Sequence, residues 1–326
     1  MWAQLTRELK IFGFLCTHPQ NNHAQNQPHP QTFVNSQIQL NALPFFQNIK
    51  NALTAGGTGG LTWHLHAALS SQRWESTKAR IETHLFKGLK LRAQLDKHSA
   101  GELKLVLIGA SAGWMMSTPW LESFKEIVIY DIDPLTPVLF RLNHGRALKQ
   151  KGVHLRFHTT DAIDQLDRIL SKHPDSVIWF DNVLGQHRIR LKNPDLASTQ
   201  LKILQRRLKG RFWGSVHDLY SGPVQRLPDS PVDALLELAR IDGSDQDSAR
   251  VRITRDENRP IDQEETSLGQ ARQRFLQKLG ATAKGGAWLD HETAKVFPPG
   301  TALTWTGWDF KRDYCHCLEL GWTSSS

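Results

Sequence analysis

Residues 103–134 read LKLVLIGASAGWMMSTPWLESFKEIVIYDIDP. Two apolar runs, at 103–108 and 126–130, enclose a turn of small residues at 109–113 and a short helix. Apolar runs of this length are typical of strands buried on both faces of a parallel sheet. A small-residue turn at the start of a helix lets backbone N–H groups approach a ligand closely. The stretch therefore predicts one βαβ unit with a ligand at its turn.

The second apolar run ends in two acids, Asp131 and Asp133. An acid at the end of the second strand, about 20 residues after a glycine-containing turn, is suited to a bidentate hydrogen bond with ribose hydroxyls. The unit therefore predicts a ligand that contains adenosine.

The same turn also matches the Gly-x-Ser-x-Gly nucleophile elbow of α/β-hydrolases, with Ser111 as the nucleophile. An elbow normally follows several strands of its sheet, whereas the first hundred residues of this chain look mainly helical. The elbow also gives no reason for Asp131. The dehydrogenase fingerprint Gly-x-Gly-x-x-Gly is absent, because position 111 is Ser and position 114 is Trp. We therefore favour a nucleotide-binding turn, and the hydrolase remains the alternative.

Composition points to an ordinary soluble protein. None of the apolar runs in the 326 residues approaches the roughly 18 residues of a membrane span. The apolar patch at 11–16 is short and no small-residue cleavage site follows it, so we expect a cytoplasmic protein with no membrane contact. The net charge of +8 permits a nucleic-acid partner. However, the Lys and Arg residues are spread along the chain, which favours a generally basic soluble protein.

The three cysteines argue against a disulfide framework, because the count is odd and two of them form a Cys-x-Cys pair. Alternation along a strand puts the thiols of Cys315 and Cys317 on one face and His316 on the other. No second Cys or His pair lies at the spacing of a zinc site, so no metal is expected.

Three segments follow from the pattern along the chain. Residues 1–37 are expected to be a short helix and a polar disordered linker, since 17–37 are rich in Gln, Asn, His and Pro. Residues 38–100 are expected to be a helical subdomain, with helices at 61–70 and 74–95. Residues 101–326 are expected to form an α/β domain with an insertion at about 229–260.

Within the α/β segment, strands alternate with helices, which predicts a doubly wound parallel sheet. Further strands are expected at 153–157, 176–180 and 212–216, followed by two antiparallel strands in the tail. Helices are expected at 137–151, 164–172, 231–240 and 262–279, with another that begins at a Ser198 or Thr199 cap. Ligand groups in such sheets lie beyond the carboxyl ends of the strands. Five polar clusters fall at such ends: Gly109 to Gly113, Asp131, Asp161, Asp181 with Asn182, and His217 with Asp218.

At these residues the chain resembles the class I S-adenosylmethionine-dependent methyltransferases, over about residues 100–220 and a final strand pair. The resemblance implies a doubly wound, mainly parallel, seven-stranded Rossmann-like sheet with an N-terminal helical extension. It implies S-adenosylmethionine as the cofactor, with its ribose on the acid that ends the second strand and its adenine near the acid after the third. The cofactor-binding residues are then Gly109, Ala110, Ser111, Gly113, Asp131, Ile132, Asp161 and Ala162.

The expected catalytic residues are Asp181, Asn182 and His217. The resemblance places the first two toward the methyl acceptor, and His217 is a candidate general base beside Asp218, as is the Asp290–His291 pair. A buried structural histidine is the rival interpretation for both histidines. The acceptor can be a small molecule, a protein or an RNA. Two other functions stay open: an α/β-hydrolase with Ser111 as nucleophile and His217 or His291 as base, and a non-catalytic Rossmann-like binding protein.

Overall fold

The computed structural model describes residues 61–95, 103–224, 236–242, 250–251, 266–280, 288–311 and 313–323. The chain divides into two units, Met1–Leu43 and Pro44–Ser326, and all the described residues belong to the second. The helix and linker expected at 1–37, and the part of the helical subdomain before residue 61, lie outside the described residues. No helix in the described part of the chain is long and apolar enough to cross a bilayer.

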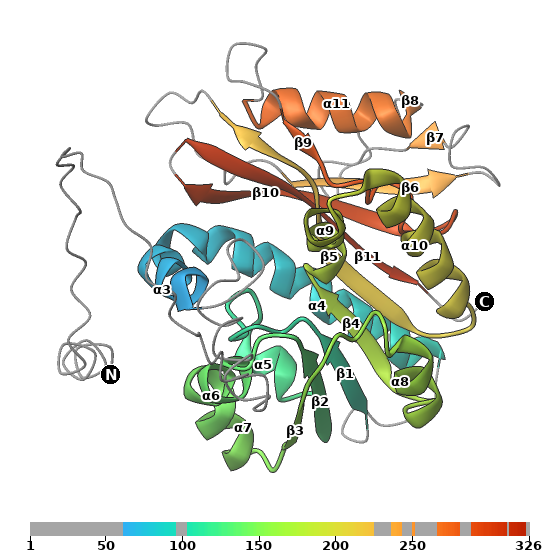
Figure 1. Ribbon diagram of the computed structural model, residues 1–326. Helices are drawn as coiled ribbons and strands as arrows, with labels where there is room; N and C mark the ends of the chain where they lie inside the picture. Colours follow the sequence, from blue (N-terminus) through green and yellow to red (C-terminus); the bar gives the residue numbers. More distant parts are fainter. Residues whose placement is uncertain are drawn as a thin grey trace, which may run out of the picture. The chain divides into compact units, whose positions relative to one another are not determined.

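One mixed sheet of eleven strands runs through the described residues (Figure 1). Its strands are β1 (Lys104–Ile108), β2 (Glu126–Asp131), β3 (His154–Thr159), β4 (Val177–Asp181), β5 (Trp213–Pro223), β6 (Leu236–Asp242), β7 (Arg250–Val251), β8 (Thr266–Ser267), β9 (Leu289–Asp290), β10 (Ala302–Lys311) and β11 (Tyr314–Thr323). The order is β3-β2-β1-β4-β5-β11-β10-β6-β7-β8, and β9 pairs with β5. The first five are parallel, and β11, β10 and β6 follow as antiparallel neighbours. The expected doubly wound α/β fold with a parallel core and a final strand pair is therefore confirmed. The expected number of seven strands is wrong, because β6, β7, β8 and β9 extend the sheet to eleven.

Helices cover both faces of the parallel part of this sheet. The helices of the described residues are α3 (Leu61–Ser70), η1 (Ser71–Trp74), α4 (Glu75–Leu95), α5 (Thr118–Leu121), α6 (Thr136–Phe140), η3 (Arg141–Gly145), α7 (Arg146–Gln150), α8 (Leu166–Lys172), α9 (Val183–Leu191), α10 (Pro194–Arg207) and α11 (Leu268–Lys278). Of these, α11 packs on the antiparallel strands, where Arg272 donates to Glu319 of β11. Leu105 and Leu107 of β1 pack in one core with α4 and α5, whereas Val106 and Ile108 pack in the other with α8 and α10. Burial on both faces explains why β1 is an almost unbroken apolar run.

Several expected helices and strands differ from the structure. The helix expected at 231–240 is wrong where the structure describes it, because Leu236–Asp242 is a strand that pairs with β10. The cap expected at Ser198 or Thr199 is also wrong, since Asn193 Oδ1 accepts the N–H of Leu196 at 3.1 Å and starts α10 earlier. Helix α9 was not expected. Strand β5 continues to Pro223 instead of ending near Val216, because β11 pairs with it over its whole length.

Candidate functional site

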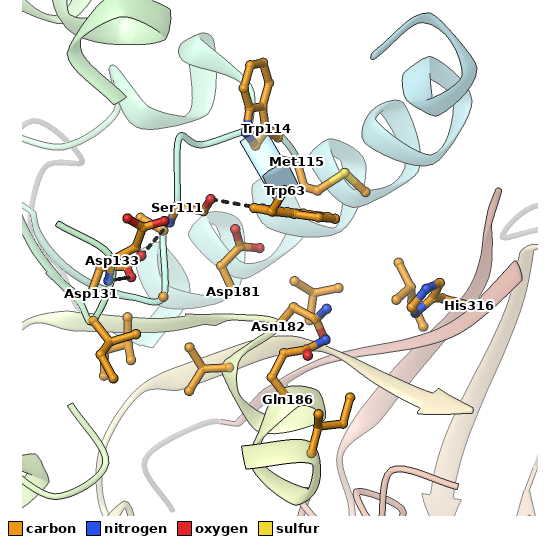
Figure 2. Close-up of a pocket in the computed structure, with 18 of the residues that line it drawn as sticks. Trp63, Ser111, Trp114, Met115, Asp131, Asp133, Asp181, Asn182, Gln186 and His316 are labelled. Carbon is orange, nitrogen blue, oxygen red and sulfur yellow. Dashed lines mark hydrogen bonds between the residues drawn. The ribbon is translucent and has the colours of Figure 1, made fainter. Parts of the chain in front are cut away.

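A cavity of about 380 Å³ lies beyond the carboxyl ends of β1, β2 and β4. One side, called the strand-end side below, comes from the parallel strands and α9: Ile108, Gly109, Ala110, Ser111, Tyr130, Asp131, Ile132, Asp133, Thr160, Asp161, Ala162, Asp181, Val183, Ile189 and Arg190. The other side comes mainly from α3 and the antiparallel strands, and includes Trp63, Ser221, Trp308, Phe310, Tyr314 and His316. In Figure 2, Asp181 lies between Asp131 and His316. The cavity is therefore where the parallel sheet and the antiparallel strands meet.

The glycine-containing turn after β1 is held in one shape by its own backbone. Gly109 and Gly113 have φ angles of 75° and 70°, in the left-handed region that favours glycine. A Cβ atom on Gly109 would lie 1.9 Å from Cγ2 of Val183. The N–H of Gly109 donates to the carbonyl oxygen of Tyr130 at 2.9 Å, which ties the turn to β2. Small residues are thus required by close packing as well as by the backbone angle.

Asp131 fixes the same turn from the end of β2. Its Oδ2 accepts the N–H of Ser111 at 2.6 Å and its Oδ1 accepts the N–H of Asp133 at 2.8 Å (Figure 2). Burial raises the pKa of Asp131, although these two N–H groups oppose the rise. Each carboxylate oxygen can accept a second hydrogen bond, so the side chain still has acceptor capacity for a ligand.

Helix α3 closes the cavity over this turn. Nε1 of Trp63 donates to Oγ of Ser111 at 3.3 Å, and Nε2 of His64 lies 2.9 Å from Oδ2 of Asp133. Trp114 Nε1 donates to the other ring nitrogen of His64 at 3.3 Å. Sequence reasoning missed these contacts, because nothing local links residue 64 to residue 133.

Asp161 is engaged by two groups. Its Oδ1 accepts the N–H of Ile163 at 3.0 Å, and its Oδ2 forms an ion pair with Arg190 of α9. Arg190 was not predicted, because it belongs to the unexpected helix α9. Ile132, next to Asp131, lines the cavity with 47% of its surface exposed. Asp161, Arg190 and the exposed side chain of Ile132 together form a wall that suits a flat heterocycle.

Asp181 differs from the other acids that line the cavity. Asp131, Asp133 and Asp161 each have hydrogen-bond partners, whereas the Asp181 carboxyl has none among the described residues. Burial, together with the neighbouring Asp131 carboxyl, raises the pKa of Asp181 to about 8. A carboxyl in this state is ready to gain a cationic partner, since a nearby positive charge would favour its ionised form.

The side-chain amide of Asn182 is already hydrogen-bonded to Asp218. It has a φ of 56°, and its side chain bonds Asp218 twice: Oδ1 accepts the Asp218 N–H at 3.0 Å and Nδ2 donates to Oδ2 at 3.0 Å. Gln186 Nε2 also donates to Asp218 Oδ2, at 3.2 Å. Burial alone would raise the pKa of Asp218, but His316 and Asn182 bring it down to about 2. Asn182 therefore lines the cavity mainly as a support for this ionised carboxylate.

The structure does not bring His217 to the cavity. Because β5 continues beyond it, His217 and Asp218 point to opposite faces of the sheet. His217 is fully buried, with Nδ1 3.1 Å from Ser215 Oγ and Nε2 3.5 Å from Glu319 Oε1. The base role expected of it therefore has no support in the geometry. His291, the other candidate, does line the cavity.

Most of the other expected site residues meet at the cavity. Those that line it are Gly109, Ala110, Ser111, Asp131, Ile132, Asp161, Ala162, Asp181 and Asn182. Gly113 lies behind the turn, where a Cβ atom would meet His144 Nε2 at 2.5 Å. Ser111 has no histidine among its described hydrogen-bond partners, so the geometry gives the hydrolase alternative no nucleophile–base pair. The site residues that were not expected include His64, Arg190 and Tyr314.

Fold and site together define a doubly wound α/β protein with a ligand cavity across the carboxyl ends of its strands. No family model and no curated protein matches the chain. Among solved structures it is similar to the N-methyltransferase NodS of Bradyrhizobium japonicum in complex with S-adenosyl-L-homocysteine, at 15% identity and a TM-score of 0.25, over 36% of this chain and 53% of that one. It is also similar to an S-adenosylmethionine-dependent methyltransferase of Clostridium acetobutylicum, at 12% identity and a TM-score of 0.25, over 66% of this chain and 82% of that one.

The chain spans about half the length of the first of these structures. At such identities and TM-scores neither similarity carries an argument about function. The function proposed below therefore depends on the geometry of the site.

Proposed function

We propose that the protein is a methyltransferase that uses S-adenosylmethionine and holds it on the strand-end side of the cavity. The observation that carries the proposal is the state of the Asp181 carboxyl. It is a carboxyl with no hydrogen-bond partner among the described residues, and it lies between the Asp131 turn and the antiparallel strands. A cavity whose central acid lacks a counter-charge suits a ligand that carries positive charge there, and S-adenosylmethionine carries a sulfonium.

The rest of the ligand fits the neighbouring residues. Asp131, which ends β2 and keeps acceptor capacity on both oxygens, would bind the ribose hydroxyls. The adenine would lie along Ile132 and Ala162, with its amino group toward Asp161. Gly109, Ala110 and Ser111 would leave room for the amino-acid end of the ligand beside the turn.

When bound, the sulfonium supplies an activated methyl group, so the protein has little covalent chemistry to perform. In-line positioning of an acceptor supplies much of the rate in such a reaction. Asp181 would hold the positive charge, and the turn with Trp63 above it would exclude water. The acceptor would enter from the side formed by β5, β10 and β11.

A change in thermal stability tests the proposal before any acceptor is known. S-adenosylhomocysteine at about 100 times its Kd should add ~2.7 kcal/mol to the free energy of unfolding and raise Tm by several degrees. Adenosine, which lacks the amino-acid end, should raise Tm less at the same concentration. An unchanged Tm with saturating S-adenosylmethionine and S-adenosylhomocysteine would remove the proposal.

A further inference from the structure

The antiparallel side of the cavity forms an aromatic chamber, consisting of Trp63, Trp308, Phe310, Tyr314 and His316. The ring of His316 lies 4.8 Å from that of Trp308, 5.2 Å from that of Phe310 and 5.5 Å from that of Tyr314, centroid to centroid. Trp63 packs against Phe310 and Trp308 at 5.5 and 6.0 Å. All five residues line the cavity. Ring walls of this kind favour a flat, apolar ligand.

His316 is held by an ionised carboxylate. Its Nδ1 lies 2.9 Å from Oδ1 of Asp218, a fully buried carboxylate whose other oxygen accepts bonds from Asn182 and Gln186. Because an ionised carboxylate can only accept, Nδ1 of His316 carries the hydrogen. In neutral imidazole the other nitrogen, Nε2, then has the lone pair. No described residue hydrogen-bonds to this Nε2.

Both ring nitrogens of the neighbouring His291 already have hydrogen-bond partners. His291 Nδ1 donates to the carbonyl oxygen of Gly185 at 2.6 Å, and its Nε2 lies 2.9 Å from Ser221 Oγ, which in turn lies 3.1 Å from the hydroxyl of Tyr314. Since the carbonyl fixes the hydrogen on Nδ1, Nε2 accepts from Ser221, and Ser221 accepts from Tyr314. Both nitrogens of His291 are therefore engaged, and His316 presents the available lone pair.

We propose that the aromatic chamber binds a flat aromatic acceptor that bears a hydroxyl group, a phenol, and that His316 is its general base. The inference rests on the proposed function and names its substrate class. Nε2 of His316 takes the hydroxyl proton, and Asp218 stabilises the imidazolium that forms. The phenol oxygen forms its bond to the methyl carbon as the carbon–sulfur bond breaks, and that electron pair returns to sulfur. The products are an aryl methyl ether and S-adenosylhomocysteine.

The charges of the chamber favour a phenol over an ammonium acceptor. Asp218 already accepts bonds from His316, Asn182 and Gln186, so the chamber offers an acceptor the Nε2 atom of His316 and ring faces. An ammonium group would need an anion of its own, and Asp181, the carboxyl of the cavity without a described hydrogen-bond partner, is assigned to the sulfonium. A phenol needs a base because it arrives protonated, and it needs flat walls because of its ring.

The probe for this inference is 4-nitrophenol, whose phenolate form absorbs visible light. It is titrated into the full-length protein saturated with S-adenosylhomocysteine, beside His316→Gln and the matched control His154→Gln, which changes an exposed histidine of β3. The wild type and the control should bind the probe and raise its phenolate absorbance. His316→Gln should bind it at least fivefold more weakly, without that absorbance, while its affinity for S-adenosylhomocysteine stays within about twofold.

Two results would overturn the inference: the probe fails to bind the loaded wild type, or it binds His316→Gln with the same affinity and absorbance. Failure of S-adenosylhomocysteine to bind the wild type would instead overturn the proposed function. If His316→Gln does not fold, 15N-histidine labelling of the wild type decides the question. The probe must then shift the Nε2 resonance of one histidine, and unchanged resonances would count against the inference.

Discussion

Replacing Asp181 by Asn tests the charge that the site is proposed to neutralise. Because the pKa of Asp181 is about 8, roughly nine tenths of this side chain is protonated at pH 7. A sulfonium favours the ionised form, so its binding displaces a proton. Affinity for S-adenosylmethionine should therefore rise with pH, by at most about tenfold or ~1.4 kcal/mol for each pH unit, and level off above pH 8.

S-adenosylhomocysteine provides the matched ligand, since it shares the ammonium group but has a neutral sulfur. The ratio of the two affinities therefore isolates the sulfonium. In the wild type this ratio should increase with pH up to about 8. In Asp181→Asn it should be independent of pH and lower at pH 8 by roughly ten- to a hundredfold, the value of a charge-assisted contact of ~1.5–3 kcal/mol.

Isothermal titration calorimetry in two buffers with different ionisation enthalpies measures the displaced proton directly. At pH 7, S-adenosylmethionine should release roughly 0.4 to 0.8 proton more than S-adenosylhomocysteine from the wild type, and none more from Asp181→Asn. Equal proton release by both ligands, or a pH-independent affinity ratio in the wild type, would refute the position assigned to this carboxyl.

Three further substitutions separate the site from the scaffold, and urea unfolding at pH 7 measures each. Asp131→Ala removes the acceptor of two backbone N–H groups, so it should cost about 2–4 kcal/mol of stability and weaken S-adenosylhomocysteine binding at least tenfold; full stability would contradict the role of Asp131 in the turn. Gly88→Ala would put a Cβ atom 2.1 Å from Trp322 Cε2 and should cost about 1–3 kcal/mol with ligand affinity unchanged. His217→Ala leaves Glu319 without its histidine and should also cost about 1–3 kcal/mol, whereas a loss of turnover at full stability would return His217 to the active site.

Much of the strand-end side could be predicted from the sequence because the information is local. The apolar runs of β1 and β2 indicate strands that are buried on both faces of the sheet. The small-residue turn and Asp131 lie within 30 residues of one another. The final strand pair was predicted on the same ground. The helix expected at 231–240 failed because strand pairing with β10, a contact about 65 residues away in sequence, outweighs local propensity there.

The antiparallel side could not be assembled from the sequence, since it depends on the register between distant strands. Pairing of β11 with β5 sets Leu318 opposite Asp218 and allows His316 to reach its carboxylate. The prediction that the thiols of Cys315 and Cys317 share one face and His316 the other agrees with the structure, in which both thiols are buried. The same alternation could not indicate which residues His316 would contact. For the same reason His217 was expected at a strand end, whereas β5 continues past it.

The most direct measurement is the binding of S-adenosylhomocysteine to the full-length protein by calorimetry at pH 7. We expect one molecule to bind each chain, with affinity reduced at least tenfold in Asp131→Ala and retained within about twofold in Gly88→Ala. No binding heat at any temperature between 10 and 35 °C, or equal binding by both variants, would contradict a cofactor held by the strand-end side of the cavity.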